Sequence, residues 1–273
     1  MSALRLCGRL AAALLFAAVP LCLAAQSAAA TITVGAGSSF DFGDARVDLG
    51  CSNLAIAGAA TAGAAALTGI ADFDLAGGSF AAGASGIALG GDFANAGSFV
   101  AGSGGVAIVD ACGSGTSTLS GTTGFHDLVV TTASAKRLVF PVGLAQSVAH
   151  ALTLQGVAGQ LLKVVSASAG QRGVLALNNG AAQTIAYVDA RDNDAGGGAR
   201  IAPGPAASFH SIDGGNLVNW FADATPGGGT GNGTAVPAPA LGCGRWLLLA
   251  LLMLAAWRGL SRQTLSRSME KRP

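Results

Sequence analysis

The sequence contains an internal repeat, and this repeat constrains the fold more than any other feature. The segment GSFAAGASGIAL, which begins at Gly78, returns as GSFVAGSGGVAI at Gly97, at an offset of 19. A fainter copy relates the segments ADF and GDF, which end at Phe73 and Phe93, at an offset of 20. A period near 20, with strands too short to bury a core alone, is typical of solenoids in which each coil stacks on the previous one.

Short segments such as GIAL, GVAI and LVV alternate apolar and small residues, and Gly, Ala, Ser and Asn separate them. This pattern predicts strands with one buried face, joined by turns. We therefore expect an all-β fold, a parallel β-solenoid over residues 31–160 with a β-rich continuation and cap over residues 161–224. The aromatic residues Trp220, Phe221 and Tyr187 would close the open end of the core.

Equivalent residues of stacked coils should form columns inside the solenoid. Phe73 and Phe93 would lie in one column, Phe80 and Phe99 in a second, and Ile87 with its counterparts in an aliphatic one. We predict that the rings of Phe80 and Phe99 point inward and stack. Core packing is favoured over a ligand-stacking role for these aromatic residues.

The N-terminal segment, residues 1–25, has the pattern of a secretory signal peptide. Arg5 and Arg9 precede an apolar run, and small residues follow at Ala24 and Ala25. We therefore expect an N-terminal signal helix and export of the rest of the chain.

The C-terminal region predicts three further parts: a Gly/Thr/Pro linker over residues 225–237, a transmembrane helix over residues 238–260 and a basic tail over residues 261–273. The wholly apolar stretch from Trp246 to Trp257 is short against the ~20 residues that a span needs. The basic residues after it favour a cytoplasmic tail, with everything before the helix outside.

The charge of the exported part argues against nucleic acid as a partner. The chain is 51% hydrophobic and 11% charged, with 42 Gly among 273 residues, which is unlike an ordinary cytosolic enzyme. Without the two terminal segments, seven Lys and Arg remain beside 13 Asp, a net charge of −6. An acidic domain would repel the phosphate backbone.

Cys51 and Cys112 are the cysteines that remain between the signal peptide and the C-terminal helix. In an oxidising exported setting such a pair predicts a disulfide. The alternative is two buried free thiols.

Asp189, Asp192 and Asp194, in YVDARDNDAGGG, are a candidate calcium site because that ion takes hard oxygen ligands. Their spacing matches no known calcium loop, and Asp, Asn and Gly also form ordinary turns. The turn is the favoured interpretation, and we expect no cofactor.

Asp72 and Asp92 should stack one coil apart, with Asp110 near the next position. Such a column suggests either solvated turn carboxylates, the favoured interpretation, or the acidic site of a carbohydrate-active β-helix enzyme. An enzyme would also need a base or an electrophilic cation nearby. The basic residues fall outside these columns, and the histidines share no spacing that indicates a metal or a triad: Arg46, Lys136, Arg137, Arg172, Arg191, Arg200, His126, His150 and His210.

The segments CSNLAIAG, GGDFANAGSFVAGSGGVAIVDAC, SGTTGFHDLVV and DGGNLVNWF resemble the coils of secreted bacterial surface proteins that end in a PEP-CTERM or IPTL-CTERM sorting signal. The resemblance implies a β-solenoid surface protein of a Gram-negative bacterium. The sorting residues would be Val236, Pro237, Ala238, Pro239 and Arg258, although the residues after Val236–Pro237 depart from the usual signature. An exosortase-like enzyme would cut near residues 236–239, from Val236 to Pro239, and a permanent single-span anchor is the alternative.

These observations favour a non-enzymatic structural protein of the cell envelope or outer surface, with a role in adhesion or a biofilm matrix. Its expected partners are the membrane, through the C-terminal helix, the sorting enzyme and a surface glycan. The alternative is a carbohydrate-active β-helix enzyme or glycan-binding module. An autotransporter passenger is disfavoured because no C-terminal barrel pattern follows.

Overall fold

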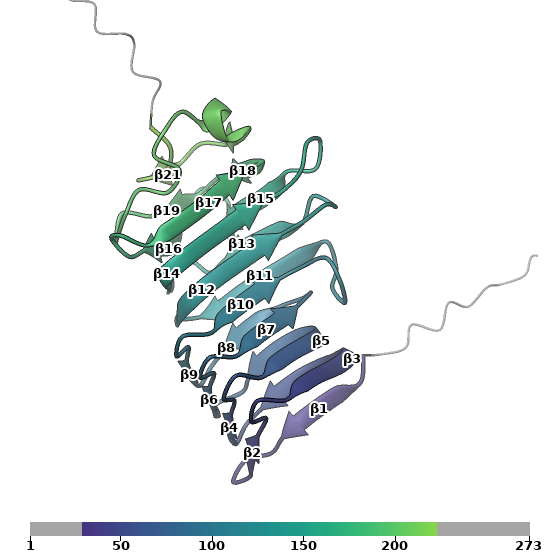
Figure 1. Cartoon of the computed structure of the whole chain (residues 1–273). Helices are drawn as coiled ribbons and strands as arrows, with labels where there is room; N and C mark the ends of the chain where they lie inside the picture. The colour runs from purple at the N-terminus through teal and green to yellow at the C-terminus, as the bar shows by residue number, and fades with distance from the viewer. Residues whose placement is uncertain (1–28, 223–273) are drawn as a thin grey trace, which may run out of the picture. The chain divides into compact units, whose positions relative to one another are not determined.

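The computed structural model describes residues 29–222, which form a stack of β-coils from β1 to β21 (Figure 1). The strands of the first half are β1 (Thr31–Val34), β2 (Ser39–Asp41), β3 (Arg46–Ile56), β4 (Ala59–Thr61), β5 (Ala66–Leu75), β6 (Ser79–Ala81), β7 (Gly86–Leu89), β8 (Phe93–Asn95), β9 (Ser98–Val100) and β10 (Gly105–Ile108).

The second half continues the stack with longer strands and ends in a short 3₁₀ helix and two short strands. Its elements are β11 (Thr116–Gly121), β12 (Thr123–Thr131), β13 (Arg137–Phe140), β14 (Ala145–Gln155), β15 (Leu162–Ser166), β16 (Gly173–Leu177), β17 (Ala182–Ala186), β18 (Val188–Ala190), β19 (Asn193–Asp194), η1 (Ala206–Phe209), β20 (Ile212–Asp213) and β21 (Leu217–Val218).

The ladders between these strands are parallel, which confirms the predicted parallel β-solenoid. Pairing runs through a 17-stranded sheet and a separate sheet of four strands, β2-β4-β6-β9. The register reproduces the repeat, because Ile87 pairs with Val106 across β7 and β10 and Phe73 pairs with Phe93 across β5 and β8. The sequence period is therefore the length of one coil.

The repeated glycines lie where the backbones of neighbouring coils touch. A β-carbon on Gly78 would collide with the carbonyl oxygen of Gly58, and one on Gly97 would collide with that of Gly78. A larger residue would push the coils apart at this corner. The glycine at the start of each GSF segment is thus required by the close contact between coils.

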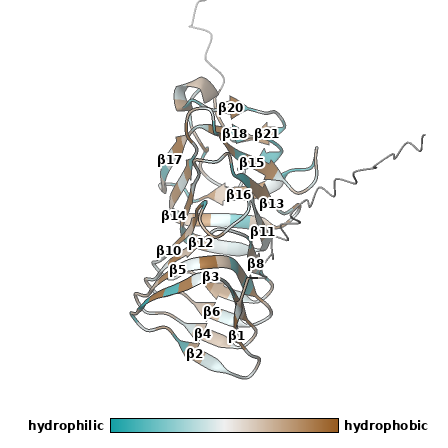
Figure 2. Cartoon of the chain, turned by 90° about the vertical axis from the view of Figure 1, so that its right-hand side faces the viewer, coloured by the Kyte–Doolittle hydropathy of each residue, from teal (hydrophilic) through white to brown (hydrophobic). Residues whose placement is uncertain are grey.

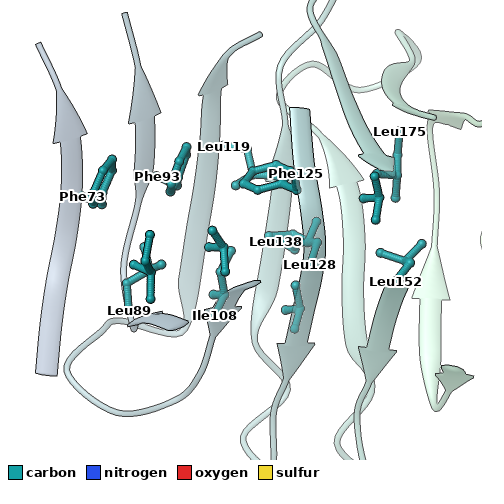
Figure 3. Packing of buried hydrophobic residues seen from close by; sticks show 14 of the residues in the cluster. Phe73, Leu89, Phe93, Ile108, Leu119, Phe125, Leu128, Leu138, Leu152 and Leu175 are labelled. Atoms are coloured by element: carbon teal, nitrogen blue, oxygen red, sulfur yellow. The ribbon is translucent and has the colours of Figure 1, made fainter. Parts of the chain in front are cut away.

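The core is a continuous filling of apolar side chains between the strand layers. Phe73 and Phe93 lie on the paired strands β5 and β8, and Phe125 of β12 lies further along the same row (Figure 3). The rings of Phe73 and Phe93 stack with centroids 4.9 Å apart. A parallel row of aliphatic residues includes Leu89 and Ile108, both fully buried. Hydrophobic and hydrophilic residues occur within the same strands (Figure 2), as expected for strands with one inward face.

Phe80 and Phe99 also stack, as predicted, with centroids 6.0 Å apart and planes within 6°. Phe80 is fully buried, whereas Phe99 is only partly buried. The difference arises because Phe99 lies on β9, the last strand of the four-stranded sheet, so no further strand of that sheet covers it.

Parallel pairing continues beyond residue 160, through β15, β18 and β20 and through β16, β19 and β21. Trp220 and Phe221 are buried at this end of the stack, and the indole N–H of Trp220 donates to Asn193 Oδ1 at 2.8 Å. Tyr187 is half-buried and stacks on His210 instead. Two of the three predicted cap aromatics therefore belong to the buried end of the core.

The predicted terminal segments lie outside the described residues. They are the signal peptide (1–25), the linker (225–237), the transmembrane helix (238–260), the tail (261–273) and the sorting residues Val236, Pro237, Ala238, Pro239 and Arg258. Between residues 29 and 222, no helix has the length and apolar character needed to cross a membrane.

Candidate functional site

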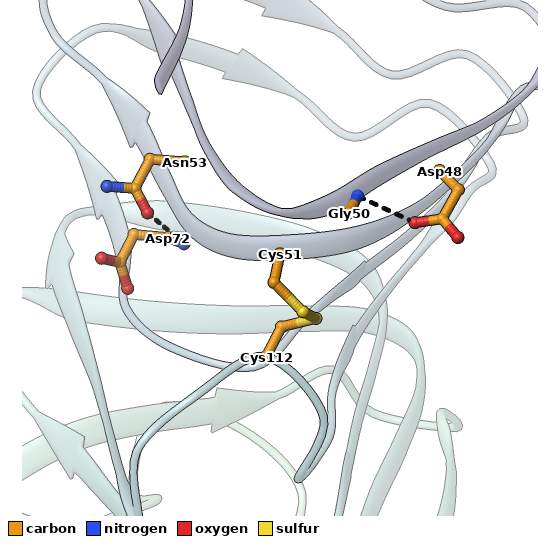
Figure 4. The surroundings of a disulfide bond; sticks show 6 residues. All are labelled: Asp48, Gly50, Cys51, Asn53, Asp72 and Cys112. Atoms are coloured by element: carbon orange, nitrogen blue, oxygen red, sulfur yellow. Dashed lines mark hydrogen bonds between the residues drawn. A yellow bond between two sulfur atoms is a disulfide. The ribbon is translucent and has the colours of Figure 1, made fainter. Parts of the chain in front are cut away.

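The predicted disulfide between Cys51 and Cys112 is present, with the two Cα atoms 4.9 Å apart (Figure 4). Cys51 lies within β3, next to Gly50, where both residues adopt positive φ angles and the strand turns a corner of the coil. Cys112 lies in the segment between β10 and β11. The bond therefore ties this later segment back to an early coil, across 61 residues of sequence.

The column of carboxylates is a chain of hydrogen-bond acceptors. The side-chain oxygen of Asn53 accepts the backbone N–H of Asp72, Asp72 accepts that of Asp92 at 2.8 Å, and Asp92 accepts that of Thr118 at 2.7 Å. Each polar side chain thus accepts a hydrogen bond from the backbone of the next coil. These groups cap N–H donors at the coil corner as well as contacting solvent.

Asp110 does not continue this column, contrary to expectation. The column passes from Asp92 to Thr118, because the Cys112 segment lengthens the intervening coil to 26 residues. Asp110 instead accepts the backbone N–H of Ala133 at 2.7 Å. Burial raises the pKa of Asp110, but hydrogen bonds from Ala133, Thr132 and Ser134 and the charge of Lys136 outweigh this and hold the pKa below its ordinary value.

Lys136 lies close to these carboxylates, although the sequence placed it outside their columns. Its side chain is fully buried, and its ammonium group donates to Gly90 O at 2.6 Å, Ser114 O at 2.9 Å and Ser117 Oγ at 3.2 Å. Burial lowers the pKa of Lys136, while the charges of Asp110 and Asp92 oppose that shift. All three donors of the ammonium group are used, so Lys136 fastens the Cys112 segment to the preceding coil.

Two of the three candidate calcium residues accept hydrogen bonds from other groups of the chain. Asp194 accepts the N–H of Gly196 at 2.7 Å, which is the geometry of an Asx turn. Asp192 accepts the amide of Asn216 at 2.6 Å, and this bond is the main reason that its pKa lies below the ordinary value. Asp189 lies on β18 and is half-buried. In the described part of the chain, these three carboxylates do not form a cluster of ligand atoms.

The structure assembles a cluster that the sequence did not indicate: His126 and Asp127 of β12 with His150 of β14. One potential ligand atom from each residue lies within 4.8 Å of the other two. Among the described residues 29–222, no other group of three or more His, Cys, Asp or Glu side chains has such geometry. Imidazole nitrogen and carboxylate oxygen together are ligands for divalent transition metals.

A β-bulge brings the three side chains together. Phe125 pairs with Val148 and Asp127 pairs with Ala151, so that His126 alone lies opposite two residues of β14. The alternation of inward and outward side chains along β12 also breaks here. His126 and Asp127 are both half-buried, and together they separate the buried residues Phe125 and Leu128. Bulges commonly redirect side chains in this way.

The Asp127 carboxylate is the centre of the cluster. Its Oδ1 lies 2.7 Å from Nδ1 of His150, within hydrogen-bond distance, and 3.1 Å from Nδ1 of His126. The second contact lacks hydrogen-bond geometry, and His126 Nδ1 is buried without a hydrogen-bond partner. The two imidazole rings stack with centroids 4.7 Å apart.

The sequence spacing of the histidines did not indicate that His126 and His150 would meet, and the structure corrects this view. The sequence repeat suggests offsets of 19 or 20 from coil to coil, whereas the offset from His126 to His150 is 24. The bulge lengthens the coil between β12 and β14, because the register offset is 23 at Phe125 and 24 at Asp127. A search for polar residues one local coil apart would have found them.

Comparison with known proteins assigns no function to the His126, Asp127 and His150 cluster or to the carboxylate column. No protein-family model matches the chain, and neither a curated protein nor a solved structure does.

Proposed function

We propose that this chain is an exported, non-enzymatic structural protein of the envelope or outer surface of a Gram-negative bacterium, with a role in adhesion or a biofilm matrix. Its coils would form the displayed part. The segment around Val236, Pro237, Ala238 and Pro239, with the apolar stretch after it and Arg258, would be the sorting signal.

The observation that carries the proposal is the Cys51–Cys112 disulfide. Structural disulfides persist in oxidising compartments and are rare in the reducing cytosol. The disulfide agrees with the signal-peptide pattern of residues 1–25, which is an independent feature of the sequence. Both features support export.

The coil interior supports a structural role. Its space is occupied by stacked phenylalanine and aliphatic side chains, and the carboxylates of Asp72 and Asp92 bind backbone N–H groups of the next coil. Such groups hold neighbouring coils in register. The polar column that could have suggested a carbohydrate-active site is thus engaged in supporting the stack.

The function is tested by fractionating the producing bacterium and mapping the chain by mass spectrometry. We expect surface-exposed protein that yields peptides from residues 31–222, begins after the signal peptide and lacks Trp246–Trp257. Protein confined to the cytoplasm would refute export. Surface protein that retains Trp246–Trp257 would refute processing and favour a permanent anchor.

A matched pair of variants tests the sorting segment itself. Replacing Pro237 and Pro239 with Ala should leave unprocessed protein in the membrane fraction, because these residues lie within the proposed cleavage segment. Replacing Pro226, which lies in the linker upstream, should leave processing unchanged. Equal processing of both variants would place the signal elsewhere.

A further inference from the structure

We propose that His126, Asp127 and His150 bind one divalent transition-metal ion of the zinc class, through one nitrogen of each imidazole and one carboxylate oxygen. Remaining coordination positions would be filled by water. This site is independent of the export and surface display proposed above, and of the former calcium candidate.

The ligand geometry requires little rearrangement. With bonds of about 2.0–2.2 Å, two ligands at a tetrahedral angle around zinc lie about 3.3 Å apart. The Asp127 oxygen is already 2.7 Å from one imidazole nitrogen and 3.1 Å from the other. Each of these two pairs therefore needs to open by less than an ångström to admit the ion, and the ligand atoms of the two histidines lie within 4.8 Å of each other.

The unpaired nitrogen of His126 is the second observation that points to a ligand. Buried polar atoms nearly always have a hydrogen-bond partner, and exceptions need an explanation. His126 Nδ1 is buried and has none, although it lies beside the Asp127 carboxylate. A metal ion held between these two atoms would accept the nitrogen lone pair and satisfy both groups.

The cluster is supported on one side and open on the other. The side chains of His126 and Asp127 are 27% and 31% exposed, whereas that of His150 is 64% exposed. Two ligands are thus held by packing on β12, and the third comes from the solvent side of β14. Three protein ligands with an open position are the arrangement of accessible zinc sites.

The donor set selects the class of ion. Two imidazoles and one carboxylate suit Zn²⁺ and neighbouring transition metals, whereas Ca²⁺ takes six to eight oxygen ligands. Binding would also connect β12 to β14, which are paired strands of neighbouring coils. A ligand that binds only the folded state raises its stability, so the ion should stabilise this part of the stack.

The test uses the full-length protein, stripped of metal with a chelator and titrated calorimetrically with Zn²⁺ and, separately, with Ca²⁺. We expect one Zn²⁺ ion per chain at this site, a higher melting temperature with Zn²⁺, and neither effect with Ca²⁺. Co²⁺ should give visible absorption bands typical of a low-coordinate nitrogen and oxygen site.

Matched variants separate this site from other ligands in the chain. His150→Ala and Asp127→Asn should each weaken binding by more than the 10- to 100-fold that loss of an outer-shell partner costs. They should also abolish the thermal shift and the cobalt bands. His210→Ala removes an exposed histidine that stacks on Tyr187 and should change nothing.

His150 is exposed, so its replacement leaves the core intact, and circular dichroism of each variant checks the fold. The proposal is overturned if the wild-type protein binds no Zn²⁺, or if the His150→Ala variant binds as many Zn²⁺ ions as the wild type with the same affinity. It is equally overturned if His150→Ala and His210→Ala weaken binding to the same extent. Either result would leave the cluster as a hydrogen-bonded pair of a histidine and an aspartate.

Discussion

The carboxylate of Asp72 accepts the backbone N–H of Asp92, the residue at the same place one coil later, at 2.8 Å. The side chain of one coil thereby takes the place of water as the acceptor for a backbone N–H of the next coil. Hydrogen bonds to charged groups contribute about 1.5–3 kcal/mol, and exposure to solvent reduces that value. The column is therefore a modest but repeated source of stability.

We predict that Asp72→Ala lowers the free energy of unfolding by about 1 kcal/mol because it removes this acceptor. Asp72→Asn should cost less, since its amide oxygen can still accept the bond. Asp74→Ala is the matched control, because Asp74 is an exposed residue of the same strand. Chemical denaturation measures all three, and equal losses for Asp72→Ala and Asp74→Ala would contradict the role of the column.

Phe80→Ala should destabilise the protein by about 3–5 kcal/mol, the usual cost of removing a buried phenylalanine. Phe99→Ala should cost clearly less, because Phe99 is only partly buried at the edge of the four-stranded sheet. Denaturant titration of both variants gives the comparison. Similar losses at the two positions would mean that Phe99 is covered in solution.

Reduction of the Cys51–Cys112 disulfide should lower stability by about 4 kcal/mol on the chain-entropy model, given the 61-residue separation. A Cys51→Ser, Cys112→Ser double variant should show the same loss and no response to reductant. Unfolding curves with and without reductant provide the measurement. An unchanged wild-type curve under reducing conditions would contradict the prediction.

Lys136→Met should destabilise the protein by about 3 kcal/mol, because Ser114 O and Ser117 Oγ lose the donor that Lys136 supplies and Gly90 O keeps only the Ser117 hydroxyl. Lys163→Met, on the exposed side of β15, is the control and should be nearly neutral. Thermal or chemical unfolding distinguishes the two. A neutral Lys136→Met would indicate that water replaces the ammonium group without cost.

The lowered pKa of Asp110 predicts a specific pH dependence. An aspartate with a depressed folded-state pKa contributes stability above its unfolded pKa, near pH 4, and loses it as the pH falls through the folded value. The stability difference between wild type and Asp110→Asn should therefore be full at neutral pH and shrink below about pH 4. A difference that does not vary with pH would refute this.

The sequence predicted the coil interior well because stacking repeats the same environment in each regular coil. The equivalences of Phe73 with Phe93 and of Phe80 with Phe99 follow directly from that repetition. The disulfide was predicted because only Cys51 and Cys112 remain between the two terminal segments. Local spacing was sufficient for the phenylalanine columns, and the number of cysteines was sufficient for the disulfide.

The polar groups could not be placed in the same way, because the coil length changes after β10. The Cys112 segment moves Thr118, not Asp110, into the column below Asp92, and it directs Lys136 towards Gly90. The bulge opposite His126 then lengthens the next coil. Irregular coil lengths of this kind leave no periodic signal in the sequence.

The glycine contacts at Gly58, Gly78 and Gly97 have a consequence for how such a chain can change in length. The coils that carry these glycines meet through bare backbone at this corner, so a duplicated copy of residues 78–96 would meet a glycine contact like the one that it left. Such an insertion would extend the stack by about 4.8 Å, the spacing of neighbouring strands. The reach of the molecule could thus change in steps of one coil, provided that the segment of Cys112 still reached Cys51, because the inserted coil would lie between the two cysteines.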